Sequence, residues 1–225
     1  EKRTDQSKEL LNFWHRLGSI DEVSALLGIS SAEHEAESLR AIESSLDDFT
    51  NANEVLTLND LLRFEQKTFL HGLLIVEDKI SMRHSLEVRV PYLDEDLTNF
   101  ASQLPGALKY DFKPSRFKKQ DMTTEKLNSR NDGKIVLRDI AKTMIPSSAN
   151  LRKQGFSAPD ATWFRNDKEK IIQKRLLNPD NEIWRYLTYD VGKTLINDHL
   201  EGRSNKRLLV WSLLTLESTI RQFEL

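Results

Sequence analysis

The chain has 225 residues, enough for one large domain or two small ones with a sizeable core. Charged residues make up 30% and hydrophobic residues 38%, and the net charge is -2, so we expect neither nucleic acid nor a membrane as a partner bound through bulk charge. The chain has no cysteine, which excludes disulfides, thiolate metal sites and a thiol nucleophile within it. It also lacks a long apolar run and a signal-peptide pattern, and we expect a cytoplasmic protein.

Three helices are expected at the beginning of the chain. Apolar residues recur at helical spacing over 7–17, with Ser7 as a candidate cap. A second helix is expected over 21–27, closed by Gly28, and a third over 31–49. The third helix is amphipathic, and we interpret its acidic outer face as a solvated surface.

A longer helix follows, with Asn59 as the expected cap and apolar side chains around much of its circumference as far as Val76. A helix of this kind is expected at the centre of the core. It delivers the chain to residues 78–94, the one stretch that interrupts a helical pattern with many chemically active side chains.

Within that stretch, residues 86–90 alternate between apolar and charged side chains, as an extended segment requires. Glu87 and Arg89 should therefore share one face, from which both could reach one ligand. The alternative is a purely structural ion pair between them. The apolar residues of the opposite face are expected to be buried: Leu86, Val88 and Val90.

The next segments return to helical patterns. Asp94, followed by two further acids, is the expected N-cap of a short helix that ends at Pro105. Residues 110–119 interleave basic and aromatic side chains, and we interpret them as a solvated loop rather than a nucleic-acid site. A helix is expected over 134–144.

The C-terminal third begins with a loop over 151–159, in which Gly155 permits unusual backbone angles beside Lys153. The remaining residues are expected to form helices. The last helix, over 205–223, is apolar nearly all round and should be a buried terminal helix.

Three of these stretches, in the same order, resemble motifs in the synthetase half of glutamine-dependent asparagine synthetases. Residues 77–97 read EDKISMRHSLEVRVPYLDEDL, similar to a signature that contains Glu-x-Arg-Val-Pro-aromatic-Leu-Asp. Residues 132–146 read DGKIVLRDIAKTMIP, which resembles the family's Lys-x-x-Leu-Arg helix. Residues 152–164 read RKQGFSAPDATWF, which resembles its Lys-x-Gly-Phe loop.

The resemblance implies an ATP-dependent amidotransferase of asparagine biosynthesis. ATP adenylates a carboxylate, typically that of aspartate, and ammonia from a glutaminase domain attacks the acyl-adenylate to give an amide, AMP and pyrophosphate. ATP and Mg²⁺ are the implied cofactors, with sites mostly outside this chain, and no metal ligand is assigned within it. The site must neutralise phosphate charge, stabilise an oxyanion and accept a proton from the attacking nitrogen.

Six residues receive roles by this resemblance. Glu87 matches the glutamate that accepts the proton from the attacking nitrogen, and Lys153 matches the lysine that stabilises the acyl-transfer intermediate and the departing pyrophosphate. Nucleotide or pyrophosphate binding is implied for four more: Lys134, Arg152, Ser85 and Arg89. One position departs from the family, because Leu151 stands where an arginine is frequent, two residues before the motif lysine.

The implied fold is mainly α, the C-terminal helical part of an α/β synthetase domain of the adenine-nucleotide α-hydrolase-like (PP-loop) type. Residues 1–225 are expected to form one such part, without a glutaminase domain. The family's Ser-Gly-Gly-x-Asp-Ser phosphate loop is also absent, so we expect the isolated chain to bind ATP weakly and to be inactive. The alternative is a catalytically silent helical interaction module, and a homodimer is compatible with either interpretation.

Overall fold

The computed structural model describes residues 2–51, 55–110, 134–149, 151, 160–166 and 170–223. These residues are mainly helical and contain no β-strand, which confirms the expected mainly α character. None of the helices in the described ranges combines the length and the hydropathy that a membrane crossing requires.

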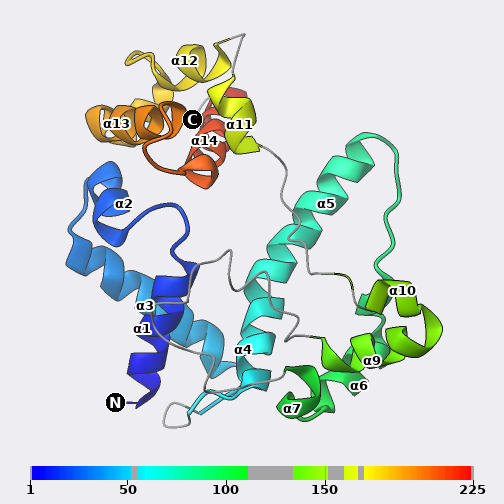
Figure 1. Cartoon of the computed structure of the whole chain (residues 1–225). Coiled ribbons are helices and arrows are strands. Elements are labelled where there is room, and N and C mark those ends of the chain that lie inside the picture. Colours follow the sequence, from blue (N-terminus) through cyan, green and yellow to red (C-terminus); the bar gives the residue numbers. More distant parts are fainter. Residues whose placement is uncertain are drawn as a thin grey trace. The chain divides into compact units, whose positions relative to one another are not determined.

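The chain divides into two compact units, drawn in Figure 1. Unit 1 combines the two ends of the sequence, Glu1–Val55 and Ser157–Leu225, and unit 2 is the segment between them, Leu56–Phe156. The expectation that residues 1–225 act as one domain stays a prediction.

Unit 1 joins three helices from the beginning of the chain with those from its end. Helix α1 packs against α3, α2 packs against α3 and α13, and α14 packs against α11, α12 and η5. The bounds are α1 (Lys2–Trp14), α2 (Ile20–Leu27), α3 (Ser31–Asp47), α11 (Asp160–Arg165), α12 (Ile171–Leu176), the 3₁₀ turn η5 (Glu182–Arg185), α13 (Tyr189–Leu200) and α14 (Arg207–Phe223).

The core of unit 1 is contiguous and centres on α14. The prediction of a buried terminal helix is confirmed for one wide face of α14, which the helices around it cover, whereas Trp211 and Leu216 on the rest of the helix are 44% and 39% exposed. Burial of large aliphatic side chains away from water is the main source of its stability. The buried apolar residues of α14 are Leu209, Val210, Leu213, Leu214 and Ile220.

A charged contact closes the packing between α12 and α14. The Arg175 guanidinium donates through Nε to Glu217 Oε2 at 2.8 Å and through Nη2 to the Leu214 carbonyl at 3.2 Å. Nη2 also contacts the Glu217 carboxylate and the Ser218 hydroxyl. Glu217 is buried, so its charge is tolerated because Arg175 pairs with it.

Local capping sets both ends of α2, and the end at Gly28 confirms the sequence prediction. Ser19 and Glu22 form a reciprocal capping box, in which the Ser19 hydroxyl accepts from the Glu22 N–H and Glu22 accepts from the Ser19 N–H. Gly28 closes the helix in the left-handed conformation, at φ 70°. The prediction for Ser7 is wrong: this residue lies inside α1 and is buried.

Unit 2 is built on one long helical run. Helix α4 (Leu58–Glu65) continues through a π turn, η1 (Gln66–Leu70), into α5 (His71–Arg83). The rest of the unit is formed by shorter elements: the 3₁₀ turn η2 (Pro91–Leu93), α6 (Glu95–Gln103), α7 (Gly106–Lys109), α9 (Ile135–Met144) and α10 (Pro146–Ala149). The N-cap of α6 is confirmed, because the Asp94 carboxylate accepts from the Leu97 N–H. The helix predicted over 134–144 is confirmed as α9.

Two predictions about the long helix are wrong. Its cap is Thr57, which forms a capping box with Asp60, and Asn59 lies inside the helix. The run is also not at the centre of a core in this chain: along α4, η1 and α5 the buried residues are Phe64 and Ser81 alone. An apolar circumference predicts burial only where other elements cover it, and in unit 2 much of α5 is uncovered.

Candidate functional site

The candidate site begins at the end of α5, where Ser85 reverses the chain. Ser85 adopts the left-handed conformation, with φ 57°. Its N–H donates to the Met82 carbonyl at 3.0 Å, and the Leu86 N–H donates to the Ser81 carbonyl at 3.0 Å. These two bonds form the double hydrogen-bonded helix end that glycine ordinarily occupies. A serine there carries backbone strain of about 1–2 kcal/mol, a feature enriched at functional sites.

Glu87 and Arg89 follow directly and lie on the same side of the chain. The Arg89 Nη2 atom is 2.5 Å from Glu87 Oε1, which confirms that the two side chains share a face. Both are exposed, Arg89 to 82% and Glu87 to 70% of the side chain. An ion pair this exposed contributes about 0–1 kcal/mol, so an anionic ligand can displace Glu87 from Arg89 at little cost.

The expected burial of the opposite face is wrong for this chain. Leu86, Val88 and Val90 are 62%, 46% and 44% exposed. The alternation correctly separates the two faces, but no described element of unit 2 covers the apolar one.

Lys134 occupies the N-cap position of α9. Like Ser85, it is left-handed, with φ 58°, and its side chain is exposed. Its carbonyl accepts from the Arg138 N–H at 2.9 Å, which begins the helix. Among the described side chains, no hydrogen bond or ion pair joins Lys134 to Glu87 or Arg89. The structure therefore brings together Glu87 and Arg89 beside Ser85.

The two remaining residues of the predicted site, Arg152 and Lys153, lie outside the described residues, within the range 152–159. Their roles stay predictions from the sequence.

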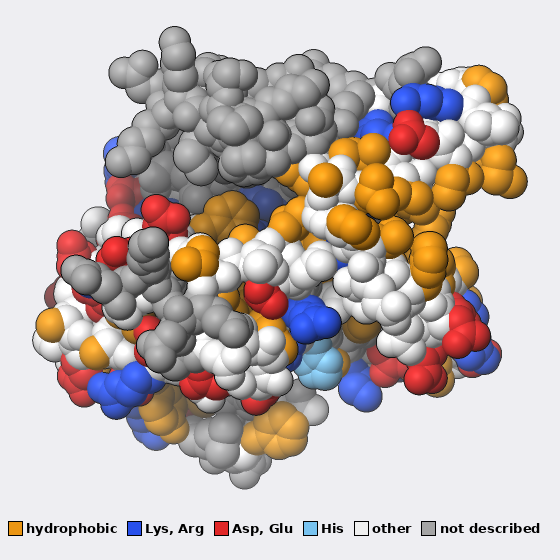
Figure 2. Space-filling view, turned by 90° about the horizontal axis from the view of Figure 1, so that it is seen from below, with side chains coloured by type: hydrophobic (Ala, Val, Ile, Leu, Met, Phe, Trp, Pro, Cys, Tyr) orange, Lys and Arg blue, Asp and Glu red, His pale blue; other side chains and the backbone are white. Residues whose placement is uncertain are grey.

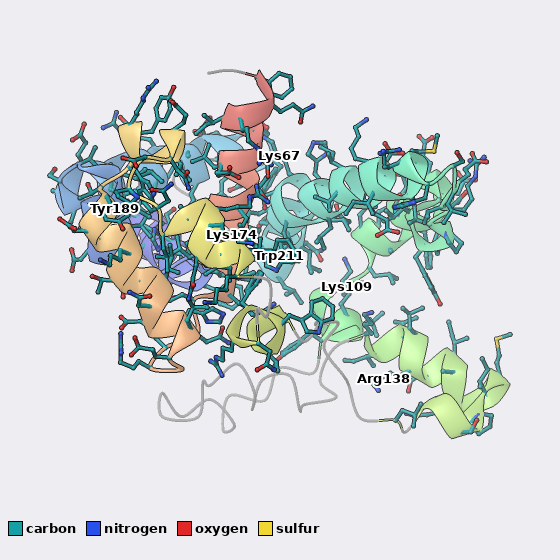
Figure 3. All side chains as sticks on the ribbon, turned by 90° about the horizontal axis from the view of Figure 1, so that it is seen from above. Lys67, Lys109, Arg138, Lys174, Tyr189 and Trp211 are labelled. Atoms are coloured by element: carbon teal, nitrogen blue, oxygen red, sulfur yellow. The ribbon has the colours of Figure 1, made fainter. Side chains whose placement is uncertain are left out.

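A polar cluster around Lys109 was not anticipated from the sequence. Lys109, labelled in Figure 3, donates through Nζ to Asn59 Oδ1 at 2.7 Å and to the Ser102 carbonyl at 3.2 Å. Asn59 in turn donates to the Leu104 carbonyl at 3.4 Å. Burial, and then the positive charge of Arg63, lower the pKa of Lys109. Asn59 and Lys109 lie 50 residues apart in the sequence, so no local pattern indicates their contact.

This cluster ties α7 and the end of α6 to α4. The cluster links helices of unit 2, and the Lys109 ammonium already donates to two acceptors within it. We therefore interpret the cluster as structural. For the implied Mg²⁺, the described residues contain no group of three or more His, Asp or Glu side chains that could hold a metal ion. No step of the chemistry is therefore assigned to a metal ion held by these residues.

Comparison with known families gives one match across nearly the whole chain. The sequence profile of the family described as asparagine synthase matches residues 2–221. The matched range contains all six predicted site residues.

Individual relatives share part of this chain and a small part of their own length. Asparagine synthetase (glutamine-hydrolyzing) 1 of Bacillus subtilis is 26% identical over 168 residues, which cover 74% of this chain and 23% of the relative. Proteins of Mycobacterium bovis and Mycobacterium tuberculosis, provisionally named asparagine synthetase (glutamine-hydrolyzing), are 33% identical over 100 residues, 44% of this chain and 13% of theirs. No solved structure matches the chain.

Proposed function

Because the chain belongs to the asparagine synthase family, we propose that it forms part of an ATP-dependent ligase that converts a carboxylate, most simply that of aspartate, to its amide. ATP would first transfer AMP to the carboxylate with release of pyrophosphate. Ammonia derived from glutamine would then attack the acyl carbon and displace AMP. The protein would accordingly act in amino-acid biosynthesis.

The observation that carries this proposal is the presentation of Glu87 and Arg89. They lie on one exposed face, next to the strained Ser85, inside the stretch that resembles the family signature. A carboxylate within reach of the attacking nitrogen can accept the proton that this nitrogen loses. Glu87 is assigned that task.

The cationic residues serve the phosphate groups in this proposal. Arg89 is available for an anion because its pairing with Glu87 is exposed and weak. Lys134 and Arg152 are assigned to the nucleotide and pyrophosphate. Lys153 is assigned to the oxyanion of acyl transfer and to the departing pyrophosphate. A positioned cation stabilises these groups more strongly as their negative charge develops in the transition state.

A second candidate function is a silent interaction module, which the exposed apolar surface of unit 2 favours. A module of this kind would keep the family's packing without its chemistry. Cytoplasmic localisation, a homodimeric assembly and the absence of nucleic-acid and membrane partners stay predictions from the sequence.

The test compares variants of the complete product of this gene. We expect ammonia-dependent release of AMP and pyrophosphate from ATP with aspartate, and a loss of about 10²-fold or more in kcat for Glu87→Gln and for Lys153→Ala. Glu182→Gln is the matched control, because Glu182 forms an exposed ion pair with Arg185 in unit 1, at 2.6 Å. This control should retain the full rate.

Two results would overturn the proposal. A folded complete product that is inert with aspartate and with other carboxylates would leave the interaction module as the function. Full activity in Glu87→Gln would remove Glu87 from the chemistry and make its pair with Arg89 structural.

A further inference from the structure

Two histidines of unit 1 lie against each other where two helices meet. His15 directly follows α1, and its N–H donates to the Leu11 carbonyl at 2.9 Å, which continues the hydrogen bonding of that helix. His34 lies in the first turn of α3, and its N–H donates to the Ser30 carbonyl at 3.0 Å. Helices α1 and α3 pack together (Figure 1), so both half-buried rings stand on a fixed backbone.

The hydrogen bonds of the two rings fix which nitrogen carries the proton. His15 Nδ1 is 2.7 Å from the Gly18 carbonyl, which can only accept, so this Nδ1 carries a proton. His34 Nδ1 is 2.8 Å from Ser24 Oγ. The single hydroxyl proton of Ser24 is donated to the Ile20 carbonyl at 2.6 Å, so His34 Nδ1 is also a donor. In each neutral ring, Nε2 therefore keeps its lone pair.

This arrangement of hydrogen bonds is the one that histidine ligands of metal ions use. A coordinating histidine ordinarily donates its second ring N–H to a carbonyl or another oxygen, which fixes the tautomer and the orientation of the ring. Both Nδ1 atoms donate in this way here, and none of the described residues forms a hydrogen bond with either Nε2 atom. Both Nε2 lone pairs are thus available to a cation.

The separation of the two rings fits two ligands of one ion. An imidazole nitrogen binds Zn²⁺ at about 2.0–2.1 Å, so the centres of two rings on one tetrahedral ion lie about 5 Å apart. The ring centroids of His15 and His34 are 5.1 Å apart, and the ring planes are inclined by 61°. Edge-to-face stacking alone has a similar spacing, but it does not require both rings to donate through Nδ1.

We propose that His15 and His34 form a binding site for Zn²⁺, which links the end of α1 to the start of α3. Two neutral imidazoles favour zinc and similar transition-metal ions over Mg²⁺ and Ca²⁺, which prefer oxygen ligands. The described residues contain no group of three or more His, Asp or Glu side chains that could hold a metal ion, so water completes the coordination.

The charge of the surface does not supply the selectivity. Among the coloured residues of Figure 2, acidic side chains intermix with basic ones, and the net charge of the chain is only -2. No field of one sign therefore gathers cations in general. Selection of zinc comes from the two imidazole ligands.

The site is independent of the proposed function, because both histidines belong to unit 1 and the candidate site belongs to unit 2. Its consequence is structural. An ion that binds the folded arrangement and not the unfolded chain stabilises the fold as its occupancy rises. Zinc should therefore raise the urea midpoint of unit 1.

The experiment is calorimetric titration of the complete product of this gene with Zn²⁺ and, separately, with Mg²⁺. His15→Gln and His34→Gln should weaken the same single equivalent of zinc binding, each by at least about tenfold. His71→Gln is the matched control, because His71 is an exposed histidine of unit 2, and its zinc titration should equal that of the native protein. The Mg²⁺ titration should not change in any of the three variants.

A variant that keeps both ligands separates coordination from folding. Ser24→Ala removes the oxygen that orients His34, so we expect zinc affinity to fall by about 10–100-fold while far-UV circular dichroism stays unchanged. Co²⁺ in place of zinc gives a second readout. The visible absorption of tetrahedral Co²⁺ should appear with the native protein and be lost in His34→Gln.

Three results would overturn the zinc proposal. They are zinc titrations that are the same in the native protein and in both ligand variants, an equal loss in His71→Gln, and full zinc affinity in Ser24→Ala together with unfolding of the two ligand variants. A complete product that is inert with carboxylates but keeps the titration that depends on His15 and His34 would refute the proposed function and leave the zinc site intact.

Discussion

Unit 1 and unit 2 are both built from helices that carry large apolar side chains, but they differ in whether those side chains are buried. In unit 1, Ile196 of α13 is fully buried in a shared core, whereas Ile80 of α5 in unit 2 is 60% exposed. The difference does not lie in composition, since both helices carry large aliphatic residues. It lies in the number of helices that pack against the apolar faces. In unit 1, helices from both ends of the chain pack together, and in unit 2 the elements beside α5 are short and leave it largely exposed.

This contrast predicts unequal costs for the same substitution. Ile196→Ala should lower the free energy of unfolding of unit 1 by about 2–5 kcal/mol, through lost burial and a cavity. Ile80→Ala should change stability by less than about 0.5 kcal/mol, because its side chain is largely in water already.

The two units can be followed separately in urea. All four tryptophans, Trp14, Trp163, Trp184 and Trp211, belong to unit 1, so their fluorescence reports on that unit, and far-UV circular dichroism reports on the helices of both. A loss of more than about 1.5 kcal/mol for Ile80→Ala would break the comparison, since such losses accompany the removal of buried aliphatic groups.

Two helical glycines sharpen the comparison. A Cβ at Gly192 in unit 1 would meet Trp184 Cη2 at 2.4 Å, whereas a Cβ at Gly72 in unit 2 meets nothing within 4 Å. Gly192→Ala should therefore destabilise unit 1 by overpacking that costs about 1–3 kcal/mol. Gly72→Ala should stabilise α5 by about 0.5–1 kcal/mol, through reduced backbone entropy in the unfolded chain. Urea midpoints measured by fluorescence and circular dichroism test both predictions. The midpoint should fall for Gly192→Ala and rise for Gly72→Ala, and a change of the same sign in both would contradict the comparison.

The smallest expected effect concerns the charged contact between α2 and the start of α14. Lys206 Nζ donates to Glu22 Oε2 at 2.5 Å, and this bond is the main cause that lowers the pKa of Glu22. The contribution of Glu22 to stability is thus present above its unfolded pKa of about 4.3 and is lost as the pH falls through the lower folded pKa. Because Glu22 is partly exposed, we expect less than about 1 kcal/mol.

The measurement is the urea midpoint of unit 1 at pH 7 and pH 3 for the native chain and for Glu22→Gln. The variant should lose stability at pH 7 and should differ less from the native chain at pH 3. Glu87→Gln is the control in unit 2, where removing an exposed pair should change stability by less than about 0.5 kcal/mol. A larger loss at pH 3 than at pH 7 would contradict the assignment.

Local rules in the sequence predicted most helices and several ends. Gly28 and Asp94 were identified because a left-handed glycine and an acidic N-cap act within a few residues of chain. The prediction of Asn59 as a cap is wrong because Thr57, two residues earlier, forms the capping box with Asp60. The Asn59 side chain instead accepts from Lys109, a contact that the local sequence does not indicate. Ser85 gave no local signal, since a serine in the left-handed conformation is uncommon.

The sequence by itself determined where the helices lie, the motif by which the family was recognised, and the separation of Glu87 and Arg89 from Leu86, Val88 and Val90. All of these follow from periodicity and from contacts between near neighbours in the chain. Only the tertiary structure decided which apolar faces are buried and that Lys109 is held by Asn59. Burial and such contacts depend on residues far away in the sequence, so one wide face of α14 is buried and α5 is largely exposed, although the sequence predicts both as core helices.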